Sequence, residues 1–133
     1  MSDRIPTIRV VSAEIQRDGR YLITQRSERA VLPLLWEFPG GRVREGETDR
    51  DALVRTLEAR IGVRVRPVER VMEVSHAYDD YKVTLAVWRC ELEDQEPQAR
   101  TVHALAWVGP DEFADYPFPG ADQKTVELLL GEG

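Results

Sequence analysis

The sequence contains a single cysteine, Cys90, so neither an intrachain disulfide nor a zinc site built from several cysteines can form. Its two histidines, His76 and His103, lie too far apart for a local metal motif. No apolar run approaches the roughly 18 residues that a membrane span needs, and the N-terminal residues lack the apolar core of a signal peptide. These absences predict a cytoplasmic protein with no membrane partner.

The sequence also lacks an excess of positive charge, because 24 acidic residues against 18 basic ones give a formal net charge of −6. This balance argues against a protein held on nucleic acid by its overall field. Only Lys82 and Lys124 are lysines, so nearly all basic residues are arginine, which suits bidentate phosphate binding. The excess of arginine over lysine can also arise from the composition of the genome alone, without any role in phosphate binding. With 133 residues and ordinary hydrophobic content, we expect one domain over residues 1–133.

Periodicity and turn signals predict a mixed α/β protein. Asp18-Gly19 predicts a hairpin turn, and the segment 93–100 is a polar loop. Extended segments are predicted at 7–15, 21–24, 36–41, 63–74, 82–92 and 102–108, with a turn at 79–80.

Two helices complete the predicted order β-β-loop-β-α-β-β-β-α. The first starts at the N-cap Thr48, places Leu53, Leu57 and Ile61 on one buried stripe, and ends at Gly62. The second spans 122–130 and begins with an acidic residue.

The stretch from 41 to 63 resembles the Nudix box, G-x5-E-x7-R-E-U-x-E-E-x-G-U, where U is aliphatic. The matching positions are Gly41, Glu47, Arg55, Leu57, Gly62 and Val63, preceded by the E-F-P-G-G segment at 37–41 that is typical of MutT-type members. The likeness covers roughly residues 7–130. It implies a Nudix-type α/β/α sandwich, with a mixed sheet, the box helix and a C-terminal helix. It also implies metal-dependent cleavage of a nucleoside diphosphate linked to another group.

Three positions depart from the family pattern. Thr56, Ala59 and Arg60 stand where the family has metal-binding glutamates, at the i, i+3, i+4 spacing of one helical face. None offers a carboxylate, and a fixed guanidinium repels a divalent cation. We therefore expect no metal ligand there and no cofactor. Glu58 faces elsewhere on the helix and is predicted to pair with Arg55.

The retained box residues Glu47 and Arg55 are the catalytic candidates, although in the family they mainly brace the loop and helix. His103 is a second candidate base, but a solvated loop histidine is the simpler interpretation.

Five residues are predicted to bind substrate. Arg60, assisted by Arg26, is expected to bind a nucleotide phosphate, or else to be a solvated helix residue. Phe38 and Tyr78 would flank a base, or else lie in the core. By its place after a Phe-Pro segment, Asp122 resembles the residue that reads the purine edge in members acting on oxidised purine triphosphates. Its alternative role is to cap the last helix.

Three functions remain open. The favoured one is a binding module for a nucleotide, a nucleoside diphosphate derivative or a protein partner, with weak or no hydrolysis. The alternative is an active nucleoside triphosphate pyrophosphohydrolase, acting on 8-oxo-dGTP or a related nucleoside diphosphate derivative. It would use Mg²⁺ or Mn²⁺ held by relocated groups, for which the candidates are Gly41, Glu37, Glu45 and Glu47. The third is an interaction domain with a vestigial pocket. Dimers are frequent in the family, so a homodimer is one expectation.

Overall fold

The computed structural model describes residues 6–30, 33–118, 122 and 125–126. The strands that precede the main helix are β1 (Thr7–Glu14), β2 (Gln16–Arg17), β3 (Arg20–Gln25), β4 (Trp36–Glu37) and β5 (Gly40–Arg42). They are followed by α1 (Asp49–Ile61), β6 (Arg66–Ala77), β7 (Lys82–Glu91), β8 (Ala104–Val108) and the 3₁₀ helix η1 (Pro110–Asp115).

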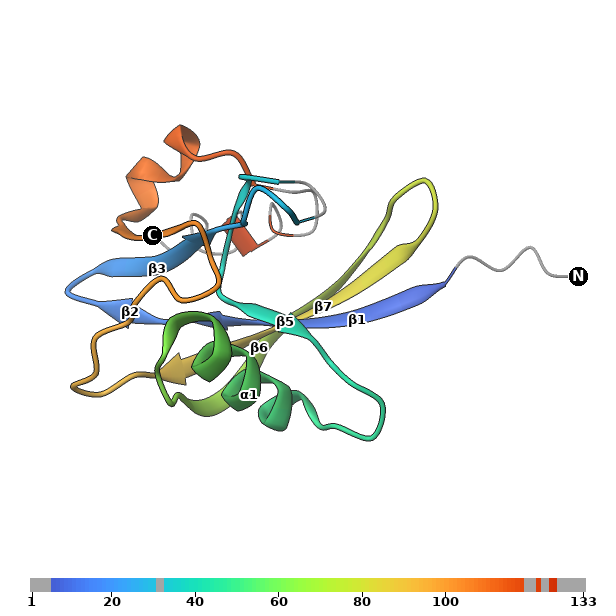
Figure 1. Ribbon diagram of the computed structural model, residues 1–133, viewed down its shortest axis with the longest axis horizontal. Coiled ribbons are helices and arrows are strands. Elements are labelled where there is room, and N and C mark those ends of the chain that lie inside the picture. Colours follow the sequence, from blue (N-terminus) through green and yellow to red (C-terminus); the bar gives the residue numbers. More distant parts are fainter. Residues whose placement is uncertain (1–5, 31–32, 119–121, 123–124, 127–133) are drawn as a thin grey trace, which may run out of the picture.

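These strands form two sheets within the described part of the chain. The first has the order β5-β1-β7-β6, in which β1 runs parallel to β7 and antiparallel to β5. In the second, β3 pairs with β2 and β4 and also with β8, all antiparallel. The predicted α/β fold with mixed strand directions is therefore confirmed (Figure 1).

Helix α1 lies across the first sheet and contacts β5, β1 and β6 (Figure 1). Both of its predicted ends are confirmed. The Thr48 hydroxyl accepts a hydrogen bond from the Asp51 N–H, and Gly62 closes the helix with a left-handed φ of 71°. The predicted stripe of Leu53, Leu57 and Ile61 is fully buried. Burial of this face fixes which side of α1 remains open to solvent.

The predicted hairpin is also confirmed, because Asp18 and Gly19 both adopt positive φ between β2 and β3. The first predicted strand is different, since it divides at the buried Ile15. Its two parts, β1 and β2, join different sheets. The chain thus passes from one sheet to the other within one extended run.

The structure differs from the predicted elements at two further places, the start of β6 and the helix η1. The strand predicted at 63–74 begins only at Arg66, because the Gln95 side chain bonds the N–H and C=O of Arg64 in place of a neighbouring strand. Helix η1 was not predicted, and it buries Phe113. Of the predicted helix at 122–130, Asp122, Thr125 and Val126 are helical, and the other residues lie outside the described residues.

Cys90 and Trp36 are two further side chains that pack away from solvent. Cys90 is buried, and burial raises the pKa of its thiol to about 12. Trp36 is half-buried and packs edge-on against Tyr116, with ring centroids 5.0 Å apart. No described helix has the length and apolar character that a membrane crossing requires.

Candidate functional site

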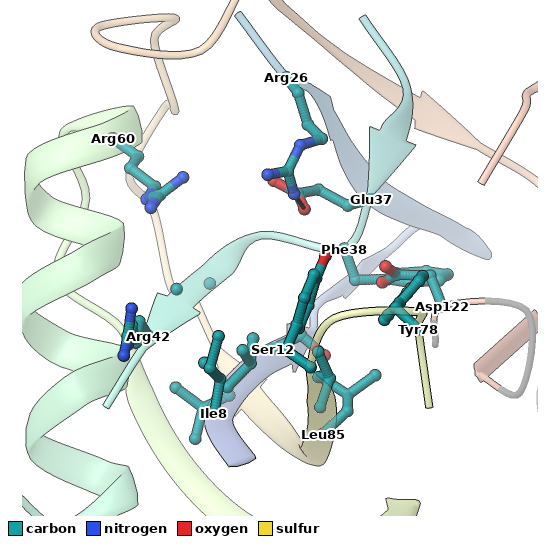
Figure 2. A pocket seen from close by; sticks show the side chains of 16 residues that line it. Ile8, Ser12, Arg26, Glu37, Phe38, Arg42, Arg60, Tyr78, Leu85 and Asp122 are labelled. Carbon is teal, nitrogen blue, oxygen red and sulfur yellow. Dashed lines mark hydrogen bonds and ion pairs between the residues drawn. The ribbon is translucent and has the colours of Figure 1, made fainter. Parts of the chain in front are cut away.

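A cavity of about 360 Å³ opens beside β5, where the two sheets approach each other. Its wall comes from β1, β4, β5, α1 and the hairpin that joins β6 to β7. All five residues predicted to bind substrate line it: Arg26, Phe38, Arg60, Tyr78 and Asp122 (Figure 2). Because Phe38, Tyr78 and Tyr81 contribute rings to this space, we refer to it as the aromatic pocket.

Two glycines let β5 form the floor between β1 and α1. A Cβ on Gly40 would lie 1.9 Å from the Val11 carbonyl oxygen, so no other residue fits beside β1. On Gly41 it would lie 2.7 Å from Cγ2 of Thr56 and 3.2 Å from an Nη atom of Arg60. The missing side chain therefore leaves the space in which Arg60 packs against the strand.

Glu37 and Arg26 form an ion pair at the wall of this pocket. An Nη atom of Arg26 lies 2.7 Å from Oε1 of Glu37, whose side chain is only 15% exposed. Burial raises the pKa of Glu37, while the positive charges of Arg26 and Arg60 oppose that rise. In Figure 2, Arg60 extends from α1 toward this pair across β5. The pair thus faces a second cation on the far side of the pocket.

Asp122 is buried on the side of the pocket away from α1 (Figure 2) and accepts a hydrogen bond from the Phe38 N–H. Its burial, reinforced by the nearby Glu37 carboxylate, raises its pKa well above the ordinary range. A protonated carboxyl can donate a hydrogen bond as well as accept one. Asp122 can therefore present either function to a ligand. Its predicted capping of the last helix depends on positions outside those described.

The aromatic side chains lie at the pocket and partly in the core, and their flanking of a base stays a prediction. Phe38 lines the pocket but is also core, since it stacks on Phe118 with ring centroids 5.5 Å apart. Tyr78 stacks on Tyr81 at 5.0 Å at the tip of the β6–β7 hairpin, and both rings face the pocket. His76 packs edge-on against Tyr78. The tyrosine pair is therefore the more accessible flat surface in the pocket.

Glu47 and Arg55 brace the loop that leads into α1. Arg55 donates two hydrogen bonds to the Glu47 carboxylate, at 2.7 and 2.8 Å, and another to the Arg42 carbonyl. This pairing lowers the pKa of Glu47 to about 2. The predicted pairing of Arg55 with Glu58 is wrong, because the loop carboxylate accepts both guanidinium bonds. The catalytic role proposed for Glu47 and Arg55 stays a prediction.

The helix face that carries the family's glutamates does not fit a divalent cation here. Thr56 is 3% exposed and its hydroxyl donates to the Ala52 carbonyl, so its proton is already used. Ala59 has no donor atom, and Arg60 carries a fixed positive charge. Among the described residues, no three His, Cys, Asp or Glu side chains lie near enough together to hold a metal ion.

The fallback ligands do not converge either. Glu37 is paired with Arg26 and Glu47 with Arg55, while Glu45 lines a different cavity. The other candidate base, His103, is exposed and lines neither cavity.

A second cavity of about 650 Å³ lies between the loop before α1 and the solvent face of the helix. Four arginines line it, with a single carboxylate from Glu45, and we refer to it as the arginine pocket. The arginines are Arg42, Arg44, Arg55 and Arg60. Arg42 and Arg60 line the aromatic pocket as well. The sequence singled out Arg60 and Arg55 but missed Arg42 and Arg44, whose only signal was their position beside the Gly-Gly turn.

Comparison with known proteins identifies the class. The model of the NUDIX domain matches residues 10–128, so the chain belongs to the Nudix family. It is 34% identical over 123 residues to CTP pyrophosphohydrolase of Escherichia coli, covering 92% of this chain and 91% of that protein. It is 30% identical over 126 residues to 8-oxo-dGTP diphosphatase of Haemophilus influenzae, covering 94% and 93%.

A solved structure agrees with this assignment. The solution structure of the E. coli ORF135 protein matches with a TM-score of 0.80 and 33% identity, covering 96% of this chain and 91% of that one.

These relatives correct the functional expectation. The favoured hypothesis of a binding module with weak or no hydrolysis is contradicted, because the relatives that match nearly the whole chain are named as pyrophosphohydrolases and diphosphatases. The missing box glutamates do not decide the function alone, because the rest of the chain matches these relatives over more than nine-tenths of its length. The alternative, a nucleoside triphosphate pyrophosphohydrolase, is the better supported hypothesis.

Proposed function

We propose that this protein is a nucleoside triphosphate pyrophosphohydrolase, which converts a triphosphate and water into a monophosphate and pyrophosphate. The observation that carries the proposal is the convergence of aromatic, cationic and carboxylate side chains on one pocket beside Gly41. Relatives covering nine-tenths of the chain are named for cleavage of CTP and of 8-oxo-dGTP, and these are the first substrates to test.

The pocket offers separate places for the base and the phosphates. The Tyr78–Tyr81 pair supplies a flat surface for a base, and the buried Asp122 can hydrogen-bond to the base edge. Arg26 and Arg60 point toward the opposite end, where the phosphates would lie (Figure 2). In Figure 2, Phe38 lies between Tyr78 and the side of the pocket that carries Arg60.

Glu37 is the carboxylate best placed to accept the proton of the attacking water. Its carboxylate pairs with Arg26 and interacts with the charge of Arg60, and both arginines favour its ionised form despite its burial. When substrate phosphates pair with those arginines, their support for the carboxylate weakens and its proton affinity rises. Water oxygen then bonds to phosphorus, its proton passes to Glu37, and the bridging P–O bond breaks with its electrons on the leaving phosphate.

The test is release of pyrophosphate and nucleoside monophosphate from CTP, 8-oxo-dGTP and the common nucleoside triphosphates, each with Mg²⁺, with Mn²⁺ and with EDTA. Glu37→Gln should lower kcat by about 10²- to 10⁴-fold, the usual contribution of a general base. Glu58→Gln is the matched control, because Glu58 is exposed and lines neither cavity.

Product formation that falls in Glu37→Gln and not in Glu58→Gln supports the proposal. Absence of product from every triphosphate under all three conditions would refute it. The cofactor requirement is decided by the same assay, whereas the cytoplasmic location and the homodimer stay predictions.

A further inference from the structure

The arginine pocket concentrates positive charge in a protein that is acidic overall. Four guanidinium groups and one carboxylate line it, in a chain whose formal net charge is −6. Within the described part of the chain, Arg55 is the lining arginine that forms an ion pair, with Glu47, whereas Arg60 and Arg44 interact with Glu37 and Glu47 through their charge alone. In the described part of the chain, the guanidinium groups of Arg42, Arg44 and Arg60 make no hydrogen bond or ion pair of their own. Three cations therefore face the pocket with their donors available to an anion.

Arg60 connects this pocket to the aromatic pocket. Its guanidinium packs over Gly41, which has no side chain to separate them, and it lines both cavities. Arg42, at the end of β5, lines both as well. Figure 2 shows Arg60 and Arg42 along the α1 side of the aromatic pocket. A linear anion leaving the aromatic pocket would pass these two arginines first and reach Arg44 beyond them.

We propose that the arginine pocket binds the terminal phosphates of the nucleoside triphosphate directly, as the metal-free polyanion. This inference rests on the proposed function and names how that substrate is held. The guanidinium groups replace the charge neutralisation that a divalent cation would otherwise supply, since the box face has no ligand set for one. Arginine also offers paired N–H donors that match phosphate oxygens in a bidentate geometry.

A divalent cation is disfavoured in the same place by the same charges. Glu45 is the sole carboxylate among the lining side chains of the arginine pocket, and it is exposed. A cation bound there would face three arginines that form no ion pair in the described part of the chain. Chelation of the phosphates by Mg²⁺ in solution should therefore weaken binding of the tail.

The experiment measures binding by calorimetry, with inorganic tripolyphosphate and with a CTP analogue that has a methylene bridge between its α- and β-phosphorus atoms. Both probes are titrated into the whole chain in EDTA and in excess Mg²⁺. We expect tripolyphosphate to bind in EDTA at least as tightly as in Mg²⁺. Arg60→Ala and the double variant Arg42→Ala/Arg44→Ala should each weaken binding in EDTA by about 10- to 100-fold, as expected for lost charge-assisted bonds.

Two further variants control for charge and geometry. Arg64→Ala removes the same charge from an exposed position outside both pockets and should leave binding unchanged. Arg60→Lys keeps the charge but loses the bidentate fork, so its affinity should fall between wild type and Arg60→Ala. Thermal unfolding of each variant verifies that it is folded before titration.

The inference is overturned if either probe binds only in Mg²⁺, or if both arginine variants bind as wild type does in EDTA. Its failure is distinguishable from failure of the proposed function. Pyrophosphate release together with metal-dependent binding would refute the metal-free tail site and leave the hydrolase intact. Metal-free binding that Arg60→Ala abolishes, without product from any triphosphate, would support the metal-free tail site and refute the hydrolase.

Discussion

Adding one methyl group at Gly41 tests whether β5 and α1 are packed as closely as the structure requires. The new Cβ would lie 2.7 Å from Cγ2 of Thr56, which belongs to a buried, hydrogen-bonded side chain that cannot simply rotate away. Overpacking of this kind costs about 1–3 kcal/mol. With a urea m value of about 1.5 kcal/mol/M, a loss of about 2 kcal/mol lowers the unfolding midpoint by about 1.3 M.

The clash predicts rescue by a second substitution. Thr56→Ser removes the Cγ2 methyl and alone should cost about 1 kcal/mol. The double variant Gly41→Ala/Thr56→Ser should therefore lose about 1 kcal/mol less stability than the sum of the losses of the two single variants. The assay is urea unfolding of the four chains followed by circular dichroism.

Gly46→Ala provides the matched control. A Cβ at Gly46 meets nothing within 4 Å, but its φ of 80° is unfavourable for alanine. Its cost of about 1 kcal/mol comes from the backbone alone, so combining it with Thr56→Ser should give simple addition. Equal stability of Gly41→Ala and wild type, or strict additivity with Thr56→Ser, would refute the packing argument.

Three other outcomes follow from buried or paired groups. Asp49 accepts hydrogen bonds from Arg9 and Trp88, and its pKa is lowered mainly by the Arg9 bond. Ionised Asp49 stabilises the folded state at pH values above the ordinary carboxyl pKa, and this stabilisation is lost as pH falls through the lowered pKa. Asp49→Asn should therefore cost about 1 kcal/mol at pH 7 in urea unfolding, with a smaller difference at acidic pH. Asp122 has a raised pKa, so the folded state takes up its proton first and gains stability as pH falls. Asp122→Asn should raise Tm at neutral pH and flatten that pH dependence; an unchanged profile would contradict it. The Cys90 thiol, with a pKa of about 12, should react with a thiol reagent only on unfolding; rapid labelling of the native protein would contradict its burial.

The proposed role of Glu37 as general base predicts how the pH dependence of kcat/KM responds to loss of Arg60. Burial raises the pKa of Glu37, whereas Arg26 and Arg60 lower it. Arg60→Ala removes one opposing charge, so the acidic limb of the kcat/KM profile should move to higher pH. A variant that loses only phosphate binding would keep the wild-type profile, which separates the two effects of Arg60.

The partner of Arg55 shows why helical spacing alone was misleading. Glu58 lies three residues away on the same helix, where side chains commonly pair. The loop residue Glu47 is farther in sequence but presents both carboxylate oxygens to the guanidinium. A bidentate bond to a loop that is also fixed by the Arg44 N–H is more favourable than one flexible surface pair.

Features that depend on neighbouring residues could be predicted before the structure was known. The ends of α1 follow from the Thr48 cap and the left-handed Gly62, and its buried face follows from the spacing of Leu53, Leu57 and Ile61. The hairpin at Asp18-Gly19 has the same local origin. Fixed spacing within one stretch also carried the family resemblance, and with it the fold.

Features that depend on contacts between distant segments could not be predicted in this way. The parallel pairing of β1 with β7 and the change of sheet at Ile15 bring together residues far apart in the chain. The same packing sets Arg60 over Gly41, between the aromatic and arginine pockets. Periodicity reports which face of an element is apolar, but not which element will cover it. The two pockets of this protein are therefore set by packing between segments that no local pattern relates.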